Sequence, residues 1–154
     1  MGYSQLAVPW FCFDLKAQKV QFWDEGEAKF STSTRERIGD AVAAVLTHPQ
    51  ETENKIVYVN SFTTSQKQLL GVLEKATGSK WEVETVSSVD VVSAGKEMLS
   101  KGNMMGIGAI VKSICFTEGW GADFEAEDVE VMNEVLGLEK ENLEDVVRKI
   151  VESF

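Results

Sequence analysis

The sequence predicts a fold of the α/β to α+β type: a small mixed sheet with a βαβ unit, surrounded by about six helices, without a complete Rossmann domain. Two observations predict it. Short runs rich in alternating or β-branched residues are typical of strands, and the segments between them repeat their apolar residues with the period of a helix. With 154 residues, 44% of them hydrophobic and 26% charged, we predict a single globular domain over residues 1–154.

The first elements are two extended segments and a helix. Residues 19–23 (KVQFW) alternate and predict a strand, and a second short extended piece follows around residues 29–31. Ser33 and Glu36 have the spacing of a capping box, which predicts the start of a helix. The helix is expected to end before Pro49, because the residue that precedes a proline avoids helical geometry. Its predicted inward face consists of Ile38, Ala41, Val42, Val45 and Leu46.

A strand–helix–strand unit is predicted next. Residues 55–60 (KIVYVN) are mostly β-branched and aromatic, as in a central strand that is covered on both faces. Thr63 and Gln66 form another capping box, and Gly78 stands where a helix often ends in a left-handed residue. Since residues 81–86 (WEVETV) alternate again, we predict that they pair in parallel with 55–60 through a right-handed crossover. The inward side chains of this helix are predicted to be Leu69, Leu70, Leu73 and Ala76.

Four helices are predicted in the remainder of the chain, at residues 89–101, 104–115, 125–136 and 141–153. Gly137 separates the last two. The final helix has the most regular pattern, because its apolar residues fall on one stripe. These residues are Leu143, Val146, Val147, Ile150, Val151 and Phe154.

The segment Gly106-Ile107-Gly108 resembles the start of a dinucleotide-binding loop. The third glycine of that motif is replaced by Val111, and the preceding residues have the pattern of a helix or loop where the motif requires a strand. No acidic residue follows at the end of a strand about 20 residues later to bind a ribose hydroxyl. We therefore expect the glycines to permit close packing of an apolar helix, and we predict that the chain alone binds no NAD(P)H or other cofactor.

Composition and charge argue against several classes of function. The net charge is −10, and residues 118–154 hold 12 acidic against 3 basic residues, so nucleic acid is not an expected partner. No apolar run approaches the roughly 20 residues that span a bilayer. Since the N-terminus also lacks the pattern of a secretory signal, we expect a cytoplasmic protein with no membrane partner. Cys12 and Cys115 are interpreted as buried hydrophobes, His48 as a helix-end residue, and no metal site is expected.

The most distinctive region runs from the helix 104–115 into the loop 118–124 (EGWGADF). This helix is apolar on almost all sides, so we expect it to be enclosed on most of them. Met104 and Met105, with aromatic residues nearby, fit either a core or an adaptable pocket wall. Trp120 stands between two glycines, a pattern that fits either a functional loop or a surface turn.

The order and spacing of several stretches resemble the second half of NmrA-like proteins. These belong to the isoflavone reductase and phenylcoumaran benzylic ether reductase group of atypical short-chain dehydrogenases, and fungal members are the most similar. In that family an N-terminal Rossmann domain binds NAD(P)H, and the C-terminal portion forms most of the substrate pocket. The matching stretches are FST-T…IG-AVAAVL-HP (30–49), N-IVYVNSFTTSQ (54–66), LLGVLEKATG (69–78) and GWGADF (119–124).

The resemblance implies a pocket for an apolar small molecule. We predict that it lies between the N-terminal aromatic segment, the helix 104–115 and the loop 117–124. Asp123 and Glu118 are the nearest candidates for acid–base catalysis. The predicted substrate-binding residues are Phe11, Phe13, Met104, Met105, Phe116, Trp120 and Phe124.

Two classes of function remain open. One is a stand-alone enzyme that cyclises, isomerises or dehydrates an apolar secondary metabolite without a cofactor, since a shaped cavity accelerates such steps by holding one conformer. The other is a non-catalytic binding or assembly module, or the substrate half of a split NAD(P)H-dependent reductase. We expect the first. We also expect a homodimer, because residues 6–13 (LAVPWFCF) form an apolar patch that another subunit can cover.

Overall fold

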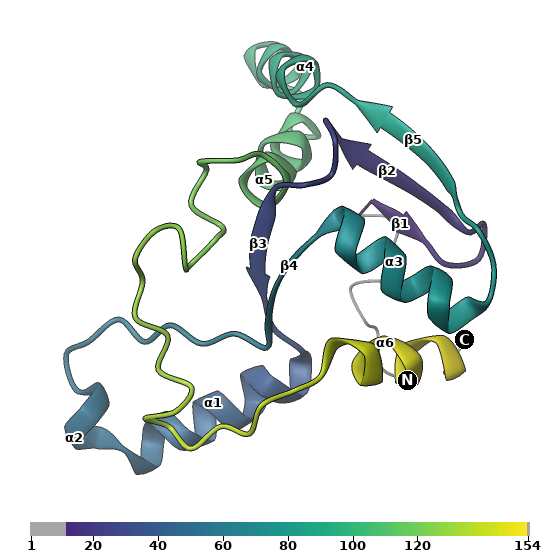
Figure 1. The fold of residues 1–154 in the computed structure, drawn as a ribbon. Helices are drawn as coiled ribbons and strands as arrows, with labels where there is room; N and C mark the ends of the chain where they lie inside the picture. Colours follow the sequence, from purple (N-terminus) through teal and green to yellow (C-terminus); the bar gives the residue numbers. More distant parts are fainter. Residues whose placement is uncertain (1–11, 154) are drawn as a thin grey trace.

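The computed structural model describes residues 12–153, which form two small sheets and six helices (Figure 1). The first sheet has the order β1-β2-β5, in which β1 and β2 are antiparallel and β2 and β5 are parallel. In the second sheet β3 and β4 are antiparallel. The predicted fold class, a small mixed sheet surrounded by helices, is confirmed. The strands are β1 (Phe13–Asp14), β2 (Lys19–Trp23), β3 (Lys29–Thr32), β4 (Phe62–Ser65) and β5 (Glu82–Val86).

Four of the helices begin at a side-chain cap. Thr34, Ser65, Ser87 and Asn142 each accept a hydrogen bond from the backbone N–H three residues later, which satisfies a donor that the first helical turn leaves free. The caps of the first two lie one and two residues after the predicted Ser33 and Thr63. The helices are α1 (Arg35–Thr47), α2 (Pro49–Thr52), α3 (Gln66–Thr77), α4 (Ser88–Ser100), α5 (Gly106–Phe116) and α6 (Leu143–Glu152).

The ends of α1 and α3 follow the prediction. α1 stops at His48, immediately before Pro49, and α3 stops at Gly78, whose φ of 67° lies in the left-handed region. No helix within residues 12–153 has the length and apolar character that crossing a membrane requires.

Two apolar clusters form the interior, one on each side of β2. Val20 and Phe22 point toward α3 and α6, whereas Trp23 points toward α4 and α5, because successive side chains of a strand face opposite ways. The first cluster consists of Phe13, Val20, Phe22, Leu69, Leu70, Leu73, Trp81 and Val147. The second consists of Cys12, Trp23, Phe30, Val92 and Phe116.

The two cysteines behave as predicted, as hydrophobes. Cys12 is buried in the second cluster, and Cys115 packs against it as a free thiol. Burial raises the pKa of the Cys12 thiol, although the nearby Lys112 partly offsets that effect. Burial also raises the pKa of the Cys115 thiol, so both thiols are neutral and unreactive near pH 7.

Gly106, the first glycine of the Gly-Ile-Gly segment, serves helix packing, as the sequence predicts. α4 crosses α5 so closely that a Cβ atom on Gly106 would lie 2.2 Å from the carbonyl oxygen of Gly95. A Cβ atom on Gly95 would in turn lie 2.8 Å from the Cβ of Ala109. The absence of side chains at these two positions therefore allows the two backbones to meet.

The predicted strand at residues 55–60 is not formed. Tyr58 makes one isolated parallel bridge to Val131, and the parallel partner of β5 is β2. The β-branched run is not covered on both faces, since the side chain of Ile56 is 78% exposed. The prediction that 55–60 pairs with 81–86 is therefore wrong, although a parallel crossover into β5 is present.

The predicted helix at residues 125–136 is also wrong, because this segment consists of turns. Asp128 has a φ of 53°, which interrupts a right-handed helix, and the backbone N–H of Met132 donates to the carbonyl of Tyr58 at 2.9 Å. Pairing with the segment at Tyr58 thus replaces the hydrogen bonds that a helix would make internally.

Several predicted inward side chains face solvent. Ile38, Val42 and Leu46 on α1 are 52%, 59% and 78% exposed, whereas Ala41 is buried. In α3 the three leucines are buried as predicted, and Ala76 is exposed. In α6, Val147 is fully buried, and Leu143 and Val151 pack against the first cluster. The predicted Phe154 lies outside the described residues.

Candidate functional site

The candidate site is an exposed apolar surface along α5. Residues 107, 111 and 114 fall one turn apart, so their side chains lie on one side of the helix, while Phe116 is buried on the other. The expectation that this helix is enclosed on most sides is therefore wrong. We call the following residues the α5 face, with their exposed fractions: Met104 (67%), Met105 (75%), Ile107 (42%), Val111 (44%), Ile114 (43%) and Trp120 (43%).

Three of the predicted pocket residues, Met104, Met105 and Trp120, thus lie on the surface. Met104 and Met105 precede the first turn of α5, and Trp120 follows its last turn, between Gly119 and Gly121, which both have positive φ. The loop that carries Trp120 leaves the end of α5 and runs past β3 (Figure 1). These side chains are free to meet another molecule.

Two further predicted residues are interior. Phe116 is 1% exposed and makes an edge-to-face contact with Phe30, with 5.4 Å between ring centroids. Phe13 is fully buried in the other cluster, where its ring meets Trp81 at 6.3 Å. In residues 12–153 these aromatic rings support the fold from within and do not line a surface beside Trp120. The predicted Phe11 lies outside the described residues.

Phe124 links the loop to the rest of the molecule. Its ring meets the ring of Tyr58 edge-on at a centroid distance of 5.4 Å, and its backbone N–H donates to the hydroxyl of Ser31 at 3.2 Å. The backbone N–H of Ser31 donates to the carbonyl of Ala122 at 2.7 Å. The end of the loop is therefore fixed against β3, while the part around Trp120 is not.

The two predicted acid–base residues differ in how they are used. One carboxylate oxygen of Asp123 accepts hydrogen bonds from the backbone N–H groups of Glu125 and Ala126, at 3.1 and 3.4 Å, and so stabilises a turn. Glu118 is exposed and makes no hydrogen bond or ion pair with the described residues. Of the two, Glu118 is the carboxylate that remains free to contact a ligand.

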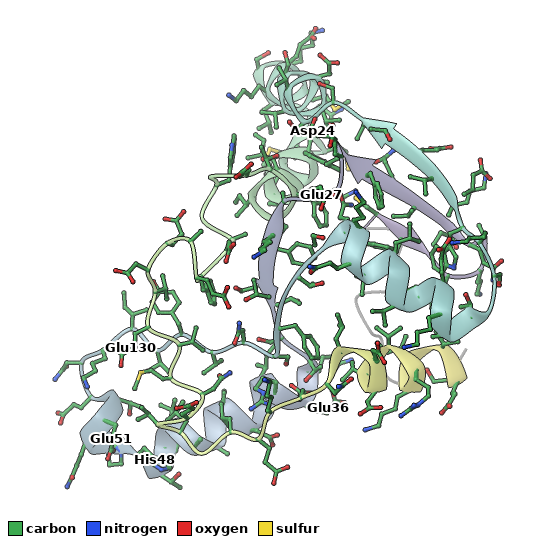
Figure 2. All side chains as sticks on the ribbon, viewed as in Figure 1. Asp24, Glu27, Glu36, His48, Glu51 and Glu130 are labelled. Atoms are coloured by element: carbon green, nitrogen blue, oxygen red, sulfur yellow. The ribbon has the colours of Figure 1, made fainter. Side chains whose placement is uncertain are left out.

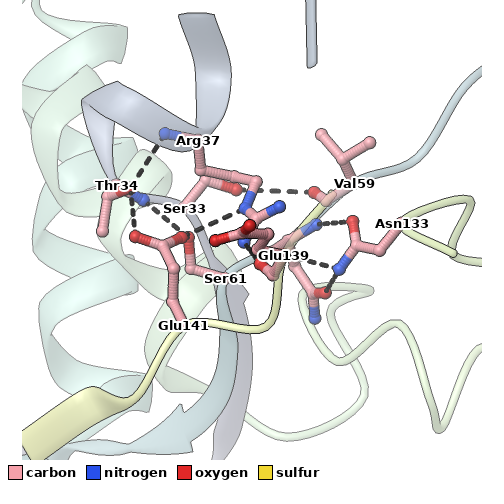
Figure 3. A network of polar contacts seen from close by, with 9 residues as sticks. Ser33, Thr34, Arg37, Val59, Ser61, Asn133, Glu139 and Glu141 are labelled. Atoms are coloured by element: carbon pink, nitrogen blue, oxygen red, sulfur yellow. Dashed lines mark hydrogen bonds and ion pairs between the residues drawn. The ribbon is translucent and has the colours of Figure 1, made fainter. Parts of the chain in front are cut away.

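A polar network that the sequence did not reveal joins three distant segments (Figure 3). Arg37, only 4% exposed, pairs with Glu141 at 3.1 Å and donates to the backbone carbonyl of Glu139. Glu141 also accepts hydrogen bonds from Ser61 and, at 2.9 Å, from Thr34. The hydrogen bonds that join the three segments connect residues 27 to 107 positions apart, so no local motif could have indicated the network.

The charges and hydrogen bonds of this network hold the joined segments in place. Burial alone would raise the pKa of Glu141, but hydrogen bonds from Ser61, Thr34 and Arg37, and the charge of Arg37, hold that pKa below its ordinary value. Beside it, the side chain of Asn133 donates to the backbone carbonyl of Asn60 at 2.8 Å. Because the polar groups satisfy one another, the network fixes the segment 133–141 and offers no free acid or base.

The histidine and the acidic residues give no sign of a metal centre. The Nδ1 atom of His48 lies 2.8 Å from the carbonyl oxygen of Ala44 in the last turn of α1, which confirms its interpretation as a helix-end residue. Among residues 12–153, no group of three or more His, Cys, Asp or Glu side chains is arranged to hold a metal ion.

Comparison with known proteins relates the chain to fungal oxidoreductases. It is 32% identical over 139 residues to the oxidoreductase aprR of Aspergillus flavus, covering 90% of this chain and 46% of that protein. It is 30% identical over 157 residues to the oxidoreductase poxI of Penicillium oxalicum, covering 99% of this chain and 49% of that protein. The chain thus spans about half the length of the curated relatives it matches. No protein-family model matches it.

A solved structure with a similar fold is also about twice as long as the region that matches this chain. A nucleoside-diphosphate-sugar epimerase from Staphylococcus aureus superposes with a TM-score of 0.60 at 20% identity, over 91% of this chain and 47% of that one. At this identity the likeness concerns the fold alone. The α/β fold of the chain thus occurs as about half of a longer protein chain.

Proposed function

We propose that this chain is the substrate-facing portion of an NmrA-like oxidoreductase. In this proposal the α5 face binds an apolar ring-containing substrate, and the dinucleotide is held by a separate portion that completes the site. The observation that carries the proposal is the α5 face itself: six large apolar side chains are exposed along one helix and its flanks. Relatives that are named oxidoreductases are about twice as long as the matched region.

The physical argument rests on the cost of exposed apolar surface. A hydrophobic group gains roughly 25 cal/mol for each Å² that is removed from water, so a stripe of this kind favours association with an apolar partner. Ile107, Val111 and Ile114 offer rigid β-branched groups, and the methionines beside them can adapt to the shape of a substrate. A surface of this composition suits a substrate with rings and few charges.

Gly106 supports the proposal that the cofactor is held outside this chain. Gly106 is occupied by the crossing with α4, so its backbone is not available to cradle a pyrophosphate. We therefore expect titration calorimetry of the chain alone with NADPH to give a dissociation constant above about 100 μM. A constant below that value would place a cofactor site in this chain and overturn the proposal.

The companion experiment adds the portion of a relative that the chain does not match. The probe is the part of Penicillium oxalicum poxI that the chain does not match, produced together with the chain and analysed by gel filtration. We expect a complex that is weakened at least about 10-fold by Val111→Glu, because the charge would be buried at the interface. Val89→Glu is the matched control: it places the same charge at a 74% exposed apolar position on α4, outside the α5 face and outside the proposed two-fold contact on α1. Equal effects of both changes would contradict a role of the α5 face.

A second candidate is the cofactor-free cyclase, isomerase or dehydratase that the sequence suggests, acting on an apolar secondary metabolite. The observation that favours it is the unengaged carboxylate of Glu118, two residues from Trp120 on the same loop. Such an acid could move a proton on a substrate held by the α5 face. The test is turnover of a polyketide or terpenoid library without cofactor, compared with Glu118→Gln. Turnover that Glu118→Gln leaves unchanged would exclude this acid as the catalyst.

Self-association is also part of the proposal. Of the predicted patch at residues 6–13, the described Cys12 and Phe13 are buried, so the exposed apolar side chains of α1 are a better candidate for a two-fold contact. Light scattering at micromolar concentration tests this, and a monomer under these conditions would remove the homodimer.

A further inference from the structure

An open groove lies between α2 and the two segments 55–58 and 129–135, apart from the α5 face. Its volume is about 660 Å³, which is within the range of small-molecule sites. We propose that this groove binds a ring-containing molecule that carries a basic nitrogen. The apolar side chains that line it are Ile56, Tyr58, Val129, Met132 and Val135.

The walls of the groove are fixed by hydrogen bonds and ring contacts. The backbone N–H of Met132 donates to the carbonyl of Tyr58 at 2.9 Å, which holds the two segments together. The ring of Tyr58 makes an edge-on contact with the ring of Phe124. On the α2 side, the hydroxyl of Thr52 donates to the carbonyl of His48 at 2.7 Å and anchors the short helix to the end of α1. A groove with fixed walls loses little conformational entropy when it binds a ligand.

The apolar lining is exposed beyond what folding requires. The side chain of Ile56 is 78% exposed and that of Val135 is 45% exposed, while Met132 is buried and forms part of the floor. A flat ring placed against these groups would remove them from water, and the aromatic ring of Tyr58 favours a ring or a cation.

The charges around the groove select the polar part of the ligand. Glu51 on α2, Glu130 on the opposite wall and Lys55 line the groove, and none of them makes an ion pair or hydrogen bond between side chains with the described residues. Figure 2 shows Glu51 and Glu130 on the same side of the molecule, at the lower left, with His48 beside Glu51. Two carboxylates against one ammonium leave the groove net negative, so it favours a cation and disfavours an anion.

Three indoles of equal ring and different charge test the proposal: tryptamine (cation), tryptophol (neutral) and indole-3-acetate (anion). Binding is followed by NMR titration of the full chain. We expect tryptamine to bind about 3- to 10-fold more tightly than tryptophol, and indole-3-acetate to bind most weakly, because partly exposed charges change affinity by about this factor. The shifts should fall on residues 50–58 and 129–135, and the preference should shrink at high salt.

Variants separate the apolar from the charged contribution. Glu51→Gln combined with Glu130→Gln should remove the preference for tryptamine and leave tryptophol unaffected. Ile56→Ser, at an exposed position, should weaken all three indoles. Glu36→Gln on α1, an exposed acid away from the groove, is the matched control and should change nothing.

Equal affinity for the three indoles, no shifts at millimolar tryptamine, or shifts confined to the α5 face would each overturn the proposal. These outcomes leave the proposed function untouched, because the NADPH titration and the Val111→Glu variant involve no residue of the groove.

Discussion

α3 and α5, the two helices on either side of the β3–β4 sheet in Figure 1, both repeat apolar residues at helical spacing, but these residues are buried in α3 and exposed in α5. In α3, Leu69, Leu70 and Leu73 are 4%, 8% and 0% exposed, because the first sheet and α6 cover them. In α5, Ile107, Val111 and Ile114 are 42% to 44% exposed. The comparison teaches that an apolar stripe predicts a helix with a face to cover, and that the stripe alone does not reveal what covers it.

The largest expected effect contrasts a buried with an exposed position of these two helices. Leu73→Ala should lower the free energy of unfolding by about 2–5 kcal/mol, because it leaves a cavity in the first cluster. Val111→Ala should change it by less than about 0.5 kcal/mol, as is usual for an exposed substitution. Urea unfolding at pH 7 measures both. A comparable loss in the two variants would mean that the α5 face is covered within the folded chain itself.

The next prediction concerns the segment that leads into α6, the cover of α3. Glu141→Gln should lower the free energy of unfolding by about 1–3 kcal/mol, because the nearly buried Arg37 loses its charged partner. Glu144→Gln is the control, since the Lys75–Glu144 pair is exposed on both sides and should contribute less than about 1 kcal/mol.

The same pair predicts a pH dependence. The pKa of Glu141 is lower in the folded than in the unfolded chain, where it is about 4.5. Its contribution is therefore fully present above pH 4.5 and is lost as the pH falls through the lower folded pKa. Unfolding measured between pH 7 and pH 3 should show this acid-induced loss in the parent chain and less of it in Glu141→Gln. Equal slopes for both proteins would contradict the assignment.

A further prediction uses two glycines on the compared helices. Gly106→Ala should cost about 1–3 kcal/mol, because the new methyl group meets the carbonyl of Gly95 where α4 crosses α5. Gly71→Ala on α3 has no atom within 4 Å of the added carbon and should stabilise the protein by roughly 0.5–1 kcal/mol through helix propensity. Thermal and urea unfolding of the pair will show opposite signs. A stabilising Gly106→Ala would mean that the crossing is looser than the structure describes.

The sequence predicts local features well where the cause is local. The strand 19–23, the end of α1 before Pro49, the left-handed Gly78 and the buried leucines of α3 depend on residues close in the chain. The glycine crossing at Gly106 was also predictable, because an incomplete phosphate-binding motif left packing as the remaining explanation. In these cases one residue type has one dominant physical role.

The misses share a different cause. Residues 55–60 have the composition of a central strand, but β5 pairs in parallel with β2 instead, and within 55–60 only Tyr58 forms a bridge, to Val131. The segment 125–136 has helical spacing, but no helix forms there. The left-handed backbone at Asp128 and the hydrogen bond from Met132 to Tyr58 replace helical geometry. The Arg37–Glu141 network and the groove at α2 each need residues from distant segments, which no single stretch of sequence displays. The predicted pocket residues were chosen because they are large and apolar. That criterion does not distinguish exposed residues such as Met105 from buried ones such as Phe13 and Phe116.

The smallest expected effect on stability belongs to the residues predicted to bind substrate. Met105→Ala changes a side chain that is 75% exposed, and Trp120→Ala changes one that is 43% exposed, on a loop that is held against β3 from Ala122 onward. The free energy of unfolding should therefore fall by less than about 0.5 kcal/mol for the methionine and less than about 1 kcal/mol for the tryptophan, where part of the ring is covered.

Binding should respond more strongly, because these side chains offer apolar area that the fold does not use. The probe is the dye 1-anilinonaphthalene-8-sulfonate, which fluoresces when its aromatic rings contact apolar surface, and its fluorescence with the α5 face should drop severalfold in both variants. Ile56→Ser in the groove is the control and should keep most of that signal. If both α5-face variants unfold the protein instead, Met105 and Trp120 belong to the core, and α5 resembles α3 after all.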